Sequence, residues 1–228
     1  MADYTTKIAI RKVTQETPQM RLFGLGEEKP WAFIPGQVAV LSTDGQNQSY
    51  FALASAPEDR GGIEVLIKEN PGTPNLFYNL KAGESFIVKG GPAGKGFPID
   101  KYKNRNLVLA AVGSAISPMR SVMRSISYRT ADFGKISFIC GVRNPADLPF
   151  TKEMDTWKKA GVNVIATVSK PTADWSGKTG YVHTYFAEAL ASMDKPVALI
   201  CGMKAMMEQS RAELTRLGVA PDEVLTNY

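Results

Sequence analysis

Cysteine and histidine are scarce in this chain of 228 residues, which contains two cysteines and one histidine. Cys140 and Cys201 lie far apart in apolar runs, so no disulfide framework is expected, and two thiols cannot supply the four ligands of an iron–sulfur cluster. With His183 as the single histidine, we expect no metal site built from the chain's own side chains. Any redox chemistry must therefore come from a bound organic cofactor.

Long apolar runs are also missing, since none approaches the roughly 20 residues that span a bilayer. The segment Met1–Lys7 lacks the apolar stretch of a secretory signal. We therefore expect a soluble intracellular protein without a membrane span, in the cytoplasm or, after removal of a transit peptide, in an organelle stroma or matrix. No tract of lysine and arginine with interleaved aromatic residues is present, so nucleic acid is not an expected partner.

The net charge of +5 is unevenly distributed along the chain. Residues 1–102 carry 11 basic and 11 acidic side chains, whereas residues 103–228 carry 16 and 11. A solvated surface explains such a bias by default. A second half that binds a polyphosphate would show the same bias.

The first hundred residues have the pattern of β-structure. Short apolar or alternating runs are separated by turn-forming pairs such as Pro35-Gly36 and Gly61-Gly62. The expected strands are Thr5–Val13, Gln37–Leu41, Tyr50–Ala54, Ile63–Ile67 and Ser85–Val88, with one helix at Thr73–Leu80. Short strands at this spacing predict an antiparallel β-barrel.

The pattern changes near residue 102 to alternating strands and helices. The expected strands are Leu107–Val112, Lys135–Cys140, Asn163–Val168, Val197–Cys201 and Val224–Leu225. The expected helices are Pro118–Tyr128, Thr151–Ala160, His183–Ser192 and Ala205–Leu217. This alternation predicts an α/β domain, a parallel sheet with helices on both faces. The predicted fold is thus a two-domain chain, with a β-barrel over 1–102 and an α/β domain over 103–228.

A glycine turn follows the first strand of the second half. Leu107–Val112 leads into Gly113, Ser114 and Ala115, and Pro118 suits the first turn of the helix that follows. Ligands of open α/β sheets bind at the carboxyl ends of the strands, where a helix N-terminus attracts phosphate. A tight strand-to-helix connection without a ligand has the same sequence, so the glycine alone leaves both interpretations open.

In their order along the chain, six segments together resemble the ferredoxin–NADP reductase family, and the similarity covers nearly the whole chain. The segments are Pro35–Val38, Ser49–Pro57, Asn75–Gly83, Gly91–Phe97, Val112–Arg120 and Ile200–Met203. The resemblance implies an N-terminal FAD-binding barrel and a C-terminal NAD(P)-binding domain, in a short member without an iron–sulfur cluster.

The chain departs from the family's R-x-[YF]-S flavin motif at two positions. Ser49 stands where the family has an arginine that pairs with the flavin diphosphate, and Ala52 stands where it has a serine near flavin N5. Lys68 is a candidate for the missing cation, although an ordinary charge at a strand edge is the alternative. These departures leave FAD against FMN partly open.

The resemblance also implies roles for individual residues. Phe51 would lie against the flavin ring, Cys201 beside the reacting nicotinamide carbon, and Tyr228 would stack on the flavin until nicotinamide displaces it. Core packing is the alternative for Phe51 and Cys201, and a frayed terminus is the alternative for Tyr228. The expected catalytic residues are Cys201 and Tyr228. The expected cofactor-binding residues are Ser49, Tyr50, Phe51, Ala52, Leu53, Ile67, Lys68, Gly72, Thr73, Pro74, Asn75, Gly113, Ser114, Ala115, Pro118, Arg143, Ser169, Lys170, Gly202 and Met203.

The expected function is therefore that of an FAD-dependent NAD(P)H oxidoreductase, which passes electrons to a redox partner protein or a small acceptor. NADPH is slightly favoured over NADH, because Arg143, Ser169 and Lys170 follow strands whose ends hold the adenosine 2′-phosphate in relatives. Two other functions stay open: an electron-transfer or regulatory subunit of a larger redox complex, and a nucleotide-binding module that has lost flavin.

Overall fold

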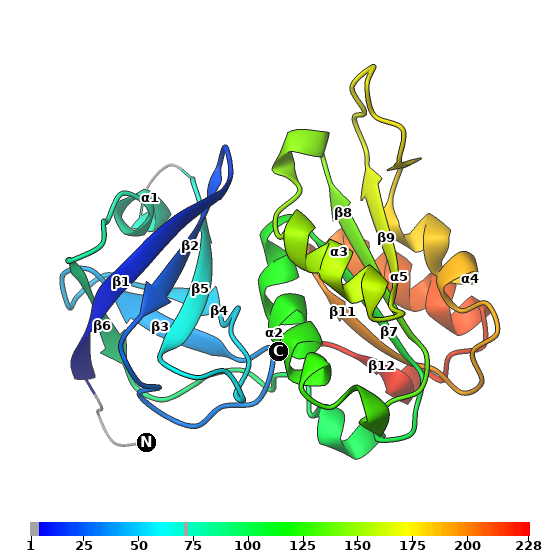
Figure 1. The fold of residues 1–228 in the computed structure, drawn as a ribbon, viewed down its shortest axis with the longest axis horizontal. Helices are drawn as coiled ribbons and strands as arrows, with labels where there is room; N and C mark the ends of the chain where they lie inside the picture. The colour runs from blue at the N-terminus through cyan, green and yellow to red at the C-terminus, as the bar shows by residue number, and fades with distance from the viewer. Residues whose placement is uncertain (1–4, 71–72) are drawn as a thin grey trace.

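The computed structural model describes residues 5–70 and 73–228, which form two halves side by side (Figure 1). Their order along the chain agrees with the predicted fold class, with an antiparallel sheet first and a parallel sheet second. The elements of the first half are β1 (Thr5–Thr17), β2 (Met20–Leu25), β3 (Val38–Ser42), β4 (Gln48–Ala52), β5 (Ile63–Lys68), α1 (Thr73–Tyr78) and β6 (Ser85–Lys89).

The antiparallel sheet closes on itself into the predicted barrel. Its strands pair in the order β4-β3-β6-β1-β2-β5. The two outer strands meet where Leu53, just after β4, forms an antiparallel bridge with Val65 on β5. The closed barrel buries one apolar core, which includes the aromatic rings of Phe23, Phe77 and Phe86.

Strand β2 was not expected from the sequence, because its side chains do not alternate between buried and exposed. Leu22 and Phe23 are adjacent and both buried. Phe23 faces the barrel core, whereas Met20 and Leu22 pack into the core of the second half. A strand covered on both faces loses the period-two pattern that identifies a half-exposed strand.

The second half is a parallel sheet in the order β10-β9-β8-β7-β11-β12. Its strands are β7 (Leu107–Val112), β8 (Ile136–Val142), β9 (Asn163–Val168), β10 (Lys178–Thr179), β11 (Val197–Cys201) and β12 (Val224–Leu225). Its helices are α2 (Ile116–Ser127), α3 (Thr151–Lys159), α4 (Phe186–Ala189) and α5 (Lys204–Arg216). The short edge strand β10 was not predicted.

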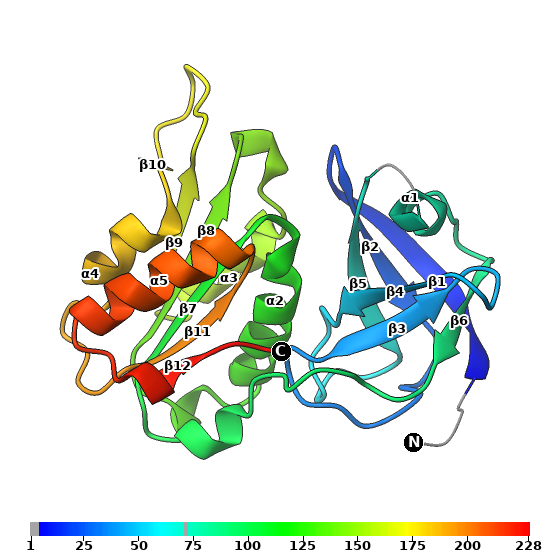
Figure 2. The same ribbon diagram turned by 180° about the vertical axis from the view of Figure 1, so that it is seen from behind.

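Helices cover both faces of this sheet, as predicted, with α2 and α3 on one face and α4 and α5 on the other (Figures 1 and 2). The side chains of β7 show why its sequence is continuously apolar. Leu107 and Leu109 contact the core under α2 and α3, whereas Val108 and Ala110 contact the core under α4 and α5. Every position of β7 from Leu107 to Ala111 is fully buried as a result.

The expected helix over His183–Ser192 is shorter and less regular than predicted. A 3-10 helix over Val182–Tyr185 leads into the four residues of α4. Ser192 adopts a positive φ of 59°, which a right-handed helix does not allow, so the helical segment ends before it.

Candidate functional site between the two halves

A cavity of about 700 Å³ lies where the barrel meets the carboxyl ends of β7 and β11. Its lining combines strand β4, the end of β5, the turn after β7 and the turn after β11. This is the edge of a parallel sheet where ligands of α/β proteins bind, and the volume lies within the range of about 300–1,000 Å³ typical of cofactor sites. The expected residues in the lining are Ser49, Tyr50, Phe51, Ala52, Lys68, Ser114, Ala115, Pro118, Cys201, Gly202 and Met203.

The barrel wall of the cavity is built by β4. Tyr50 is 63% exposed, whereas Phe51 is half-buried, with its ring centroid 5.0 Å from that of Phe77 in the barrel core. The Phe51 ring therefore packs against the barrel core and also lines the cavity. Strand β4 thus presents an aromatic, partly apolar surface to any ligand in the cavity.

Lys68 is the single charged side chain in the cavity lining among the described residues. It lies at the end of β5 and shares the cavity with Ser49, the residue in the place of the family's arginine. Since no carboxylate lines the cavity in the part of the chain that the structure describes, the electrostatic potential of the cavity favours an anionic ligand.

The second wall is the turn between β7 and α2. Gly113 has a φ of 55°, in the left-handed region that favours glycine. A Cβ atom at this position would meet no other atom within 4 Å, so protein packing does not demand the glycine. A one-turn 3-10 helix over Gly113–Ala115 precedes α2, and Pro118 lies in the first turn of α2, as expected.

Cys201, at the end of β11, contributes a thiol to the cavity lining. It is 8% exposed, and burial raises the pKa of its thiol to about 12, although the Gly202 backbone acts in the opposite direction. Its Sγ donates to Asn227 Oδ1 over 3.4 Å, and Asn227 Nδ2 donates to the Gly36 carbonyl over 3.0 Å. The thiol is therefore protonated at neutral pH and is held by a residue that also binds the barrel.

Some expected residues lie outside the cavity lining. Leu53 and Ile67 are fully buried in the barrel, and the Leu53 N–H is already donated to the Gln37 carbonyl over 2.9 Å. The Leu53 N–H is therefore already paired within the barrel. Tyr228 is 59% exposed, and its hydroxyl donates to Met207 Sδ on α5 over 2.8 Å.

The remaining expected residues fall into two groups. Arg143, Ser169 and Lys170 are exposed together beyond β8 and β9, where the Lys170 N–H donates to the Arg143 carbonyl over 2.7 Å. Of the other expected cofactor-binding residues, Thr73, Pro74 and Asn75 begin α1, and Gly72 lies outside the described residues. Asn75 Oδ1 is buried without a hydrogen-bond partner among the described residues.

The cavity also includes residues that the sequence did not single out. Ser117 lies in the first turn of α2, and its hydroxyl donates to the Ala52 carbonyl over 2.8 Å. The sequence signal that could have identified Ser117 is a hydroxyl residue directly before Pro118. The other unexpected lining residues are Val38, Gln48, Leu66, Asn70 and Val112.

Residues 109–212 match the family model described as an oxidoreductase NAD-binding domain. The gamma subunit of sulfhydrogenase 1 from Pyrococcus furiosus is 28% identical over 227 residues, which cover 96% of this chain and 77% of that protein. An NADH-cytochrome b5 reductase-like protein from Arabidopsis thaliana is 30% identical over 179 residues, which cover 74% of this chain and 51% of that protein.

Solved structures share the fold over the full length of the chain. A ferredoxin NADP+ reductase from Neisseria gonorrhoeae, with bound FAD and NADP, superposes with a TM-score of 0.83 at 19% identity and covers 97% of both chains. A cytochrome P450 reductase from Amycolatopsis superposes with a TM-score of 0.84 at 22% identity, over 100% of this chain and 71% of that one.

The barrel, the parallel sheet and the matched domain define a two-part nucleotide-binding oxidoreductase of the electron-transfer type. The matched domain and the shared fold support the resemblance to the ferredoxin–NADP reductase family found in the sequence. Within the described residues, no helix has the length and apolar character needed to cross a membrane.

Proposed function

We propose that the chain is an FAD-dependent NAD(P)H reductase, which moves hydride between nicotinamide and bound FAD and then passes electrons to a separate acceptor. In this proposal residues 1–102 hold the FAD and residues 103–228 hold the nucleotide. The observation that carries it is one cavity lined by β4, by the β7–α2 turn and by Cys201. A flavin and a nicotinamide need such a shared space, because hydride passes only between groups in contact.

The residues of the cavity fit FAD by shape and charge. The aromatic wall of Tyr50 and Phe51 suits a flat ring, and Lys68 supplies a positive charge for a diphosphate that Ser49 cannot neutralise. Outside the cavity lining, Asn75 Oδ1 at the start of α1 is buried without a hydrogen-bond partner among the described residues, so it is a candidate acceptor for a donor of the bound cofactor. FAD, when bound, supplies the hydride acceptor and the stepwise release of electrons.

The chain's own part in the reaction is orientation and exclusion of water. Phe51 supports the flavin side of the cavity, and the Ser114–Ala115 turn supports the nucleotide side. The protonated Cys201 thiol fills the space beside the reacting carbon without competing for a proton. Tyr228 would first leave its contact with Met207 and cover the flavin. Nicotinamide would then displace it.

The nucleotide preference follows from the exposed group Arg143, Ser169 and Lys170. Two cations and a hydroxyl at the ends of adjacent strands suit the 2′-phosphate of NADPH. We therefore propose NADPH as the preferred donor, with NADH as the weaker one.

A second proposal is that the chain works as the reductase subunit of a larger redox complex. The relative that supports it is the gamma subunit of sulfhydrogenase 1, which this chain matches over 96% of its own length. A reductase subunit would turn over slowly in isolation and faster after its partner protein is added. This behaviour would distinguish the role.

The test is an assay of purified protein incubated with FAD and then freed of excess cofactor. We expect a yellow protein that oxidises NADPH with ferricyanide as acceptor, at a rate proportional to its flavin content. A protein that stays colourless yet binds NADPH would contradict the proposal and leave a nucleotide-binding module without flavin.

A further inference from the structure

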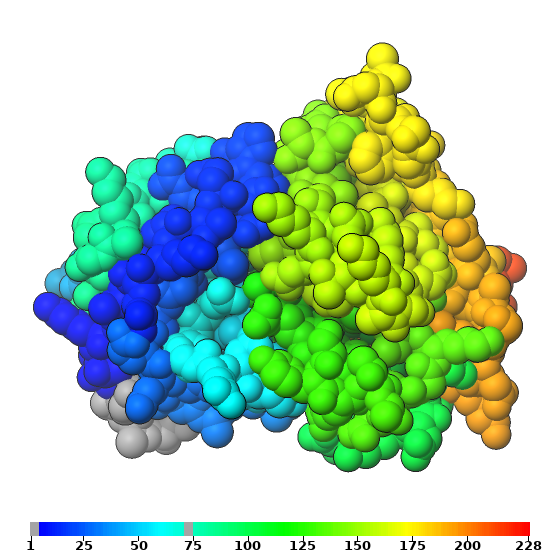
Figure 3. Space-filling view, in the orientation of Figure 1, coloured from blue at the N-terminus to red at the C-terminus, as the bar shows by residue number. Residues whose placement is uncertain are grey.

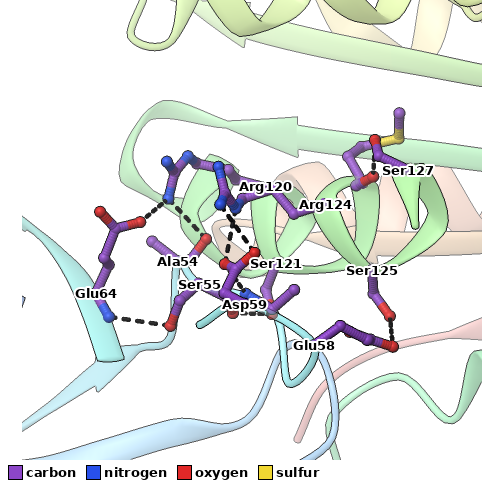
Figure 4. A network of polar contacts seen from close by, with 12 residues as sticks. Ala54, Ser55, Glu58, Asp59, Glu64, Arg120, Ser121, Arg124, Ser125 and Ser127 are labelled. Atoms are coloured by element: carbon purple, nitrogen blue, oxygen red, sulfur yellow. Dashed lines mark hydrogen bonds and ion pairs between the residues drawn. The ribbon is translucent and has the colours of Figure 1, made fainter. Parts of the chain in front are cut away.

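Helix α2 joins the two halves through polar contacts along one of its faces (Figure 4). Three of its residues bind carbonyls at the end of β4 and in the segment that follows it. The Ser117 hydroxyl donates to the Ala52 carbonyl over 2.8 Å, Arg120 Nη1 to the Ala54 carbonyl over 2.8 Å, and the Ser121 hydroxyl to the Ser55 carbonyl over 2.6 Å.

The same face of α2 continues this contact one turn further on. Arg124 binds both carboxylate oxygens of Asp59 over 2.8 Å, and the Ser125 hydroxyl donates to Glu58 over 2.7 Å. Side chains spaced three and four apart lie on one side of a helix, so α2 meets residues 52–59 in a single register. In the space-filling view this segment of the barrel (cyan) abuts the green surface of α2 (Figure 3).

Arg120 is the centre of these contacts. It is 3% exposed, and all three of its guanidinium nitrogens have acceptors. Glu153 on α3 accepts from Nε and Nη2, at distances between 2.6 and 3.0 Å, and Glu64 on β5 accepts from Nη1 over 2.7 Å. The guanidinium also lies 4.6 Å from the centre of the Phe150 ring.

A buried ion pair of this kind adds little to stability, because the cost of removing the charges from water offsets their attraction. It does fix geometry, because a planar guanidinium donates its hydrogen bonds in fixed directions. Arg120 holds Ala54 and Glu64 of the barrel and Glu153 of the second half at the same time. Keeping all three contacts at once therefore restricts how the two halves can move relative to each other.

The two walls of the cavity are both attached to this contact. Ala52 lines the barrel wall and Ser117 lines the nucleotide wall, and they are hydrogen-bonded to each other one helical turn from Arg120. A sliding of α2 along residues 52–59 would therefore move one wall relative to the other. A displacement of about 1 Å costs on the order of 10²-fold in rate when two reacting groups must be in contact.

We propose that Arg120 is a positioning residue, which fixes the separation of the two cavity walls and hence the distance between the nicotinamide and the flavin. This role rests on the proposed function. It requires no contact between Arg120 and either ligand, and Arg120 is absent from the cavity lining. The expected signature is therefore a loss of rate without a loss of binding.

The test variant is Arg120→Met combined with Glu153→Gln, which removes the guanidinium without leaving two carboxylates unpaired near it. We expect unchanged affinity for FAD and NADPH, within about threefold, and a 10- to 100-fold slower reduction of the flavin at saturating NADPH. The matched control is Arg216→Met, which removes an exposed ion pair with Glu213 on α5 and should change neither quantity. Reduction at the rate of the unmodified protein would overturn the proposal.

A second measurement needs no activity. Spin labels at Lys7→Cys and Lys159→Cys, both exposed, report the distance between the halves in the ligand-free protein, because Cys140 and Cys201 are buried. We expect one narrow distance distribution with Arg120 present and a shifted or broadened one in the double variant. If the unmodified protein binds no flavin, the proposed function fails, but this measurement still decides the role of Arg120. An unchanged distribution would overturn it.

Should the double variant not fold, Glu64→Gln alone keeps the inference testable, because Glu64 is one-third exposed and binds only one of the guanidinium nitrogens. We expect a smaller loss of rate with the same unchanged affinities. A loss of affinity in proportion to the loss of rate would contradict a positioning role.

Discussion

Lys68 and Ser49 share the cavity, and in the proposed function they determine how the barrel neutralises an anionic cofactor. The lysine is a flexible point charge, whereas the arginine of the family's motif would bind a diphosphate with two hydrogen bonds. One charge-assisted hydrogen bond is worth about 1.5–3 kcal/mol, or roughly 10- to 100-fold in affinity. The chain should therefore bind FAD through Lys68, though less tightly than a protein with the full motif.

We predict that Lys68→Met weakens FAD binding by about 10- to 100-fold, because the cavity loses the one cation that its described residues supply. Ser49→Arg should strengthen binding by restoring a second cation at the adjacent strand. The measurement is flavin fluorescence quenching against added protein, with Lys204→Met, a highly exposed lysine on α5, as the control. Equal affinity of Lys68→Met and the unmodified protein would place the diphosphate elsewhere.

Cys140 gives a second prediction at this scale. Burial raises the pKa of its thiol from 9.0 to about 12, and the side chain is fully enclosed. The folded protein keeps this proton between pH 9 and 12, where the unfolded chain releases it. The resulting stability is fully present below pH 9 and is lost as the pH rises toward 12.

We therefore expect the free energy of unfolding to fall between pH 8 and about pH 10.5, by roughly 2 kcal/mol from this thiol. In Cys140→Ala the fall should be smaller by that amount, while the variant loses some stability at both pH values through the lost contacts. Urea denaturation at the two pH values measures both quantities. An identical pH dependence in variant and parent would show that the buried thiol does not contribute.

At the scale of elements, the proposed function assigns the β7–α2 turn to the nucleotide. Gly113 adopts its left-handed φ with open space around it and lies between Val112 and Ser114 of the cavity lining, so a side chain there would meet no other protein atom nearby. We predict that Gly113→Val weakens NADPH binding at least tenfold but costs only about 1–2 kcal/mol of stability, which is the backbone penalty. Isothermal titration and thermal unfolding of the same preparation separate the two effects.

The control for this prediction is Gly83→Val, another glycine with a positive φ and open surroundings, which lies in the barrel before β6. It should show a similar loss of stability and no change in NADPH affinity. A Gly113→Val variant that binds NADPH normally would exclude the turn from the nucleotide site.

The elements also show what the sequence alone can predict. The bounds of β7, β9, β11 and β12 were predicted without error, because a strand buried between two helix layers is apolar at nearly every position. Strand β2 was missed because Leu22 faces the second half while Phe23 faces the barrel core. That arrangement depends on how the halves contact each other, which no local pattern records.

The residues of the candidate site can also be divided into those that the sequence predicts and those that only the structure shows. Residues on β4 and in the β7–α2 turn are contiguous in the sequence and were found through a family resemblance. Arg120, Ser117 and Asn227 were not assigned roles, because their partners lie 33 to 191 positions away along the chain. Only the folded structure shows that a buried arginine and a buried asparagine hold the two halves together.

At the scale of the whole molecule, two contacts connect the barrel to the α/β half beside the cavity. One is α2 with residues 52–59. The other is Asn227, whose carbonyl accepts from the Lys95 and Gly96 N–H groups while its side chain binds Cys201 and Gly36. The cavity is therefore held on two sides, which suits a reaction that needs fixed separation rather than acid–base catalysis.

The most direct test of this account is the anaerobic absorbance spectrum of the FAD-loaded protein, recorded before and after adding NADPH and, in a separate sample, NADH. We predict a flavin band that is bleached by both nucleotides and faster by NADPH. A flavin band that neither nucleotide bleaches, although both bind, would contradict the claim that the cavity brings flavin and nicotinamide into contact.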